Sequence, residues 1–230
     1  MNGSVFDVHF MFTAIPQILA YLPVTLFLAG VSSAAGLILG FLIAVARYFS
    51  VPVLNSISRI FVTVIRGTPP MCQLLLSYYG IPILLRAINN QYGTSFSVDG
   101  IPAMVFAIFA LSCNGAAYMS ETIRSSMAGV DQGQLEACYS LNMTRWQAVR
   151  HVVLPQAFAT ALAPLGNTAS GLLKDTSLVF NISVVEMMTE AEIIGSRAFR
   201  FFEVYVVVSV IYLVVCFLLE QLLAYAERRA

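Results

Sequence analysis

Charged residues are scarce in this sequence: they form 10% of its 230 residues, against about 25% in an ordinary soluble domain. The formal net charge is +0, so no basic surface is available to attract nucleic acid. Hydrophobic residues make up 59% of the chain, and the mean hydropathy is +0.82. This composition predicts an integral membrane protein, in contact with lipid, in which residues 1–230 form a single membrane domain.

Cysteine and histidine are also few, with four cysteines and two histidines. Neither a clustered Cys/His metal pattern nor a Gly-rich phosphate loop is present, so we expect no cofactor in this chain. An intramembrane enzyme would need a nucleophile with a base or a metal cluster, whereas His9 and His151 both fall in segments expected outside the membrane. We therefore predict no enzymatic activity. The cysteines are interpreted as small packing residues, and they are Cys72, Cys113, Cys138 and Cys216.

Lys and Arg are absent from the first 20 positions. A cleaved signal peptide begins with basic residues, so we do not expect one here. Residues 10–22 are apolar but contain Pro16, and Pro23 follows directly. We interpret this stretch as a short helix in the outer membrane interface.

Long apolar runs follow, and each is long enough for the roughly 20 residues that a bilayer requires. We predict five transmembrane helices, at residues 25–46, 60–85, 102–127, 158–180 and 204–223. The polar stretches 86–100 and 181–203 are interpreted as outer loops. The fold class is therefore an all-α, polytopic membrane protein.

Two of these spans carry unusual polar groups. Pro69 and Pro70 must disturb the second span, because neither donates a backbone hydrogen bond. Arg66 precedes them: it either reaches water beside a kink or has a role in a transport path. In the third span, Glu121 and Arg124 are three residues apart on one helix face, and we expect an ion pair there.

The placement of basic residues predicts the orientation. Three of them fall in the loops on one side of the membrane, namely Arg86, Arg197 and Arg200. Seven fall on the opposite side, namely Arg47, Arg59, Arg124, Arg145, Arg150, Arg228 and Arg229. The side with seven should be the cytoplasm, which places the N-terminus outside and the C-terminus in the cytoplasm.

The longest polar interruption, residues 133–157, lies on this cytoplasmic side. It carries too many charges to cross a membrane, and we expect a short helix, a turn and a second helix that re-enters the lipid. The alternative interpretation is an ordinary polar loop between two membrane helices. Asn142 lies where the turn is expected, and Asn tolerates the positive φ that such a turn needs.

This stretch resembles the EAA loop of permease subunits from bacterial ATP-binding-cassette importers. The family pattern is Glu-Ala-Ala, then a Gly, then an Ile shortly before Leu-Pro. Asn142 stands where the family has Gly, and Val152 where it has Ile. The resemblance implies that the loop couples the permease to an ATPase through Gly133, Glu136, Ala137, Cys138, Asn142, Leu154 and Pro155. The small residues Ala137 and Cys138 are expected to be exposed and to enter a groove on the ATPase.

The resemblance extends over most of the chain. Residues 66–69, 117–124 and 174–178 are similar to the polar-amino-acid branch of these importers, which includes cystine, glutamine and basic-amino-acid permeases. It implies a bacterial cytoplasmic membrane location and three kinds of partner: a dimer of cytosolic ATPases that holds ATP and Mg, an extracytoplasmic substrate-binding protein, and a second permease chain, either a copy or a sister subunit.

The fourth span contains the strongest candidates for a substrate path. Lys174 and Asp175 are adjacent, and charges at membrane depth must face protein or a water-filled cavity. Either a neighbouring helix or the second permease satisfies each of them, or at least Asp175 faces the path and meets the ammonium of an amino acid. Asn167 and Ser170 would then supply neutral hydrogen bonds, and Arg66 is a further candidate.

Two other functions are compatible with a polytopic membrane protein, namely a secondary transporter and a channel for small polar solutes. Many secondary carriers contain paired repeats, but five spans are an odd number and the sequence shows no internal repeat. The resemblance therefore favours an importer permease.

Overall fold

The computed structural model describes residues 6–96 and 100–227, so Ser97, Asp99, Arg228 and Arg229 lie outside the described residues. Helices account for nearly all of this part of the chain, which contains no strand. The α-helices are α1 Val8–Leu19, α2 Leu22–Tyr48, α3 Pro52–Arg66, α4 Pro70–Leu75, α5 Ile81–Tyr92, α6 Ala103–Ala128, α7 Gln132–Ser140, α8 Arg145–Ala148, α9 Leu154–Asp175, α10 Met187–Ala198 and α11 Phe201–Glu227. Shorter π and 3₁₀ segments connect some of them, at η1 Leu76–Gly80, η2 Val149–Val153 and η3 Thr176–Ile182.

Four helical segments in the described part are long and apolar enough to cross a membrane: Leu22–Tyr48, Pro70–Tyr92, Ala103–Ala128 and Phe201–Ala226. The all-helical fold class is thus confirmed. α9 also has 22 residues, but its polar side chains make it less apolar than these four. The count of five spans and the orientation across the membrane stay predictions.

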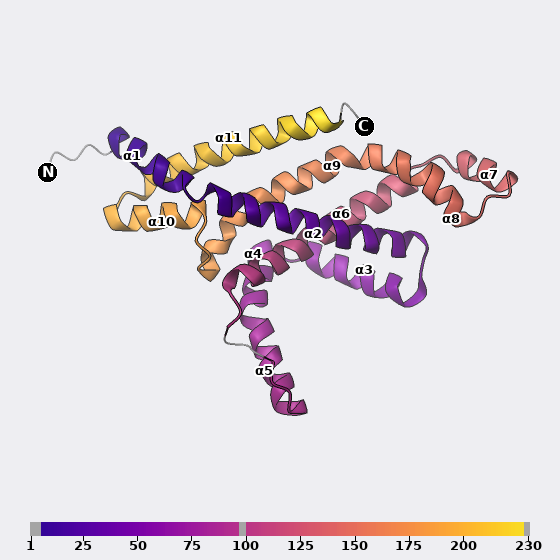
Figure 1. The fold of residues 1–230 in the computed structure, drawn as a ribbon, viewed down its shortest axis with the longest axis horizontal. Coiled ribbons are helices and arrows are strands. Elements are labelled where there is room, and N and C mark those ends of the chain that lie inside the picture. The colour runs from indigo at the N-terminus through magenta and orange to yellow at the C-terminus, as the bar shows by residue number, and fades with distance from the viewer. Residues whose placement is uncertain (1–5, 97–99, 228–230) are drawn as a thin grey trace.

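α6 forms the centre of the bundle. It packs against α2 and α9, and α11 packs on the other side of α9 (Figure 1). In its most apolar window 61% of α6 is buried within the protein, against 28% for α2 and 33% for α11. The outer helices therefore keep apolar faces free for lipid or partner chains.

Small residues bring α2 and α6 close together. A Cβ atom added at Gly36 would lie 3.2 Å from the backbone nitrogen of Ala116, and one added at Gly40 would lie 3.0 Å from that of Ser120. Side chains of ordinary size would separate the two backbones. This is the packing that small faces permit in membranes, where van der Waals contact rather than the hydrophobic effect joins helices.

The disturbance predicted at Pro69 and Pro70 within the second span, residues 60–85, is confirmed as a full break, and the segment long and apolar enough to cross a membrane is Pro70–Tyr92 instead. α3 ends at Arg66 and α4 begins at Pro70, because the two prolines interrupt the backbone hydrogen bonds. The side chain of Gln73 closes the break by donating from Nε2 to the carbonyls of Ile65, at 2.6 Å, and Thr68, at 2.9 Å. Beyond the break the chain turns, and α5 points away from the rest of the bundle (Figure 1).

The two predicted outer loops also contain helices. The stretch predicted as a loop from residue 86 continues α5 to Tyr92. Residues 181–203 contain α10, because Glu186 caps its first turn and its apolar face packs on α11. Polarity alone does not separate a loop from an amphipathic helix. The predicted N-terminal helix is confirmed as α1, which packs against α10 and α11.

Candidate functional site

The predicted surface loop folds as two short helices joined by a tight turn. α7 begins after Asp131, whose carboxylate accepts a hydrogen bond from the backbone of Gly133 at 2.6 Å. Asn142 has φ 58°, so the expected positive-φ turn residue is confirmed. Thr144 then caps α8 in a reciprocal capping box with Gln147. Leu154 and Pro155 open α9, and thus the loop leads directly into that helix.

α7 presents only part of its predicted contact face. Gly133, Glu136 and Ala137 are exposed, and the Glu136 carboxylate makes no hydrogen bond or ion pair with other described residues. Cys138, in contrast, is buried, with 6% of its surface exposed. The expectation that Cys138 is exposed beside Ala137 is wrong, because adjacent residues on a helix point about 100° apart.

The loop rests on the end of α2. Arg145 donates a hydrogen bond to the carbonyl of Tyr48 at 3.1 Å, and its guanidinium lies 5.0 Å from the ring centre of Phe49. The rings of Trp146 and Phe49 lie 5.9 Å apart. These contacts join residues far apart in the sequence, and no sequence motif indicated them.

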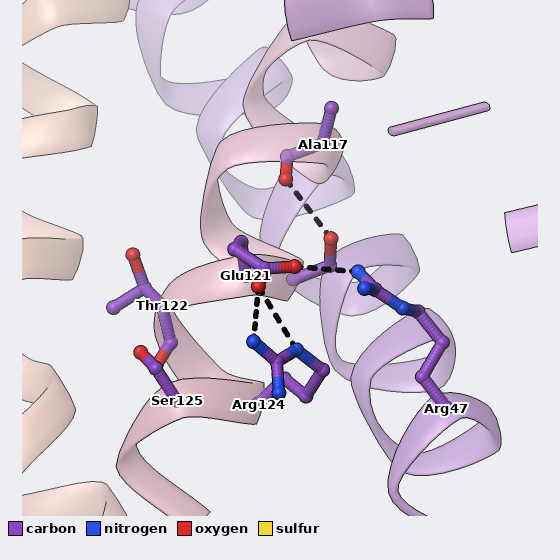
Figure 2. A network of polar contacts seen from close by, with 7 residues as sticks. Arg47, Ala117, Glu121, Thr122, Arg124 and Ser125 are labelled. Carbon is purple, nitrogen blue, oxygen red and sulfur yellow. Dashed lines mark hydrogen bonds and ion pairs between the residues drawn. The ribbon is translucent and has the colours of Figure 1, made fainter. Parts of the chain in front are cut away.

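A charge network joins α2 and α6 near the same end (Figure 2). The predicted ion pair of Glu121 and Arg124 is confirmed, with Arg124 Nε 2.9 Å from the carboxylate. Arg47 of α2 binds the second oxygen of Glu121 at 2.5 Å. The carboxylate therefore holds two helices together, which sequence spacing along one helix did not reveal.

A polar cavity of about 320 Å³ lies between α4, α6 and α9. Asn167 and Asp175, two of the predicted path residues, line it together. They are eight residues apart, and Gly171 lies between them on the same helix face. The lining residues are Pro70, Asn114, Tyr118, Asn167, Thr168, Gly171, Leu172 and Asp175.

The structure does not bring the other predicted path residues into this cavity lining. Ser170 is buried, with its hydroxyl unpaired among the described residues, and Lys174 is exposed. Both lie on a different face of α9 from Asp175, since residues one or five apart in a helix do not share a face. Arg66 is exposed at the end of α3, with its guanidinium 5.2 Å from the ring centre of Tyr118.

The α6 side of the cavity was missed as a site. Asn114 is 5% exposed, and its side-chain amide donates to Gln73 at 3.0 Å. Tyr118 lines the cavity beside Arg66. A polar amide inside an apolar span is itself a signal, because such groups are costly in a membrane unless they find a partner.

A polytopic helical bundle with a polar cavity among its helices and a capped helix pair at one end has the architecture of a membrane permease. Residues 36–230 match the family described as binding-protein-dependent transport system inner membrane component. The L-cystine transport system permease protein TcyL of Bacillus subtilis is 38% identical, over 97% of this chain and 91% of that protein. The glutamine transport system permease protein GlnP of Escherichia coli is 32% identical, over 97% of each chain.

Solved structures agree with these relatives. A chain from the crystal structure of an amino acid ABC transporter with histidines is 34% identical, covers 98% of this chain and 99% of its own, and has a TM-score of 0.84. The methionine ABC transporter MetNI in an inward-facing conformation is 17% identical, with a TM-score of 0.73 over 94% of this chain and 97% of that one, and shows a similar fold. The chain belongs to the family of binding-protein-dependent transport system inner membrane components.

Proposed function

We propose that this chain is the permease of an amino-acid importer in a bacterial cytoplasmic membrane. Its partners are a dimer of cytosolic ATPases, an extracytoplasmic substrate-binding protein and a second permease chain, either a copy or a sister subunit. The named activities of relatives such as the cystine and glutamine permeases support an amino acid as the substrate. ATP and Mg are bound by the ATPase partner.

The loop would transmit the movement of the ATPase. α7 offers the exposed residues Glu136 and Ala137 for docking, and Glu136 lies in the middle of this nine-residue helix. Arg145 and Trp146 tie the loop to the end of α2, while Leu154 and Pro155 connect it to α9. A displacement of α7 would therefore be passed to two helices of the bundle.

The substrate would pass the cavity between α4, α6 and α9. One carboxylate and several neutral polar groups line the cavity. This lining suits an amino acid, because the carboxylate can pair with its ammonium and the neutral groups can hydrogen-bond to the rest of it. Asp175 would meet the ammonium, and Asn114 and Asn167 would orient the rest of the amino acid. A second permease chain would complete the enclosure of the path.

The observation that carries the proposal is that Asp175 and Asn167 face one cavity together with Asn114 of another helix. The test is Asp175→Asn in proteoliposomes that contain the ATPase and the binding protein. This change keeps the shape of the side chain and removes its charge. We expect a loss of uptake of tenfold or more, from about 1.4 kcal/mol or more of lost charge-assisted binding, with basal ATP hydrolysis unchanged.

The matched control is Lys174→Gln, which alters the adjacent charge outside the cavity lining and should leave uptake near normal. Normal uptake with unchanged substrate preference in Asp175→Asn would exclude this role of the carboxylate. Uptake that proceeds without the ATPase would instead indicate a secondary transporter or a channel.

A further inference from the structure

A second cavity, an apolar groove of about 560 Å³, lies mainly between α2 and α9 at the end of the bundle that carries the loop. Leu37 and Leu42 form part of the α2 wall, and Phe158, Ala161 and Leu165 form part of the α9 wall. Arg150 is the one polar residue that lines it. The groove is thus distinct from the polar cavity, with which it shares no residue.

Arg150 is exposed, and its guanidinium makes no hydrogen bond, ion pair or ring contact with other described residues. Arg47, Arg124 and Arg145, in contrast, all have partners. A guanidinium binds phosphate through paired hydrogen bonds, so Arg150 at the rim of an apolar groove is suited to a phosphate attached to an apolar chain.

The length of the groove fits one leaflet of a bilayer. Its α9 wall runs from Leu154 to Leu165. Eleven residues at about 1.5 Å each span roughly 16 Å. This is about half of a hydrocarbon core of ~30 Å. Because Arg150 precedes Leu154 in the chain, the cation lies at the loop end of the groove and the apolar walls extend away from it.

We propose that this groove binds an anionic phospholipid from the leaflet on the loop side, with its phosphate at Arg150 and an acyl chain between α2 and α9. The proposal rests on the proposed position of the loop at the membrane surface. Arg150 belongs to the π-helical segment η2, which joins α8 to α9. Such segments occur frequently at functional sites. The bound lipid would therefore hold the junction through which movement of the loop reaches α9.

The first test measures which lipid remains bound. The full-length chain, with the subunits that co-purify, is taken from nanodiscs of phosphatidylcholine with a minor share of phosphatidylglycerol, and retained lipids are counted by native mass spectrometry. We expect wild type to retain phosphatidylglycerol preferentially. Arg150→Gln should lower that preference about five-fold, the effect of one cation near an anionic surface. Arg59→Gln, which removes an exposed arginine outside the groove, should retain it.

The second test fills the groove. Leu42 lines it with 60% of its surface exposed, so Leu42→Trp adds bulk without displacing a core residue. Leu39, on the same helix, is 45% exposed and lies outside the groove, so Leu39→Trp is the matched control. We expect Leu42→Trp to lose the retained lipid and Leu39→Trp to keep it.

Three results would overturn the proposal. Arg150→Gln and Leu42→Trp could both retain phosphatidylglycerol as their controls do. Arg150→Gln could lose a co-purifying ATPase while its bound lipid is unchanged, which would make Arg150 a protein contact. Leu42→Cys could form a disulfide between two copies of the chain, which would place a second permease over the groove. Because the readout is bound lipid, a failure here differs from a failure of amino-acid uptake.

Discussion

Two carboxylates at different places in the bundle are stabilised in opposite ways. Glu121 on α6 lies between two guanidinium groups, and 25% of its side chain is exposed. Glu186, which precedes α10, is fully buried and meets hydroxyl and backbone donors, with no ion pair among the described residues. Figure 1 places α10 and the loop helices at opposite ends of the molecule.

The fully buried carboxylate of Glu186 holds more helices together than the partly exposed carboxylate of Glu121 does. One oxygen of Glu186 accepts from Thr25 of α2 at 3.1 Å and from Tyr212 of α11 at 2.9 Å. The other accepts from the backbone of Thr189 at 3.0 Å. Glu186 lies outside the candidate spans, and burial raises the pKa of its carboxyl while these hydrogen bonds act against the shift. One ordered acid thus ties three helices together.

The largest effect expected from this difference is on stability. Glu186→Ala removes the buried acceptor of two hydroxyls and a backbone donor and should lower the free energy of unfolding by about 3 kcal/mol. Glu121→Ala should lower the free energy of unfolding by about 1.5 kcal/mol, because Arg124 stays in contact with solvent and only Arg47 is left largely shielded. Thermal unfolding of the two purified variants in the same detergent shows which variant loses more stability. Glu186→Gln, which keeps an acceptor, should recover part of the loss, and an equal loss in both alanine variants would contradict the comparison.

A smaller difference is expected within the Glu121 network. Arg47 joins α6 to another helix and only 14% of its side chain is exposed, whereas Arg124 pairs within its own helix and is 33% exposed. Arg124→Gln should lower the free energy of unfolding by about 0.5 kcal/mol, and added salt should reduce this loss. Arg47→Gln should cost about 1.5 kcal/mol with less dependence on salt. Unfolding measured at low and high ionic strength distinguishes the two arginine variants. An identical effect of salt on both would argue against a difference in burial between Arg47 and Arg124.

Single cysteine substitutions at the surface should have the smallest effect on stability. They test whether Glu121 and Glu186 lie near opposite membrane surfaces. After the native cysteines are replaced, single cysteines at Tyr139, in the loop, and Ser196, in α10, report the two ends. Both positions are exposed. A membrane-impermeant thiol reagent should reach Tyr139→Cys only from the cytosol and Ser196→Cys only from outside. Labelling of both from one side would refute the predicted orientation.

The sequence predicted the loop better than it predicted the cavity. In the loop, the order of a short helix, a turn at Asn142 and a second helix was predicted, because the turn depends on local backbone preferences, whereas the caps Asp131 and Thr144 and the burial of Cys138 were not. The cavity was predicted in part: Asn167 and Asp175 line it, whereas Ser170 and Lys174 do not. Polarity marks a residue as unusual in a membrane span, but helix rotation decides which cavity it faces.

The sequence by itself determined the helical membrane class, the break at Pro69 and Pro70, and the turn at Asn142. Each follows from composition or from backbone chemistry within a few residues. Only the tertiary structure decided that Arg145 rests on the end of α2 and that Asn114 joins Asp175 in one cavity. Those contacts link residues far apart in the chain, and they arise when small residues let α2, α6 and α9 pack closely, a geometry that no local pattern encodes.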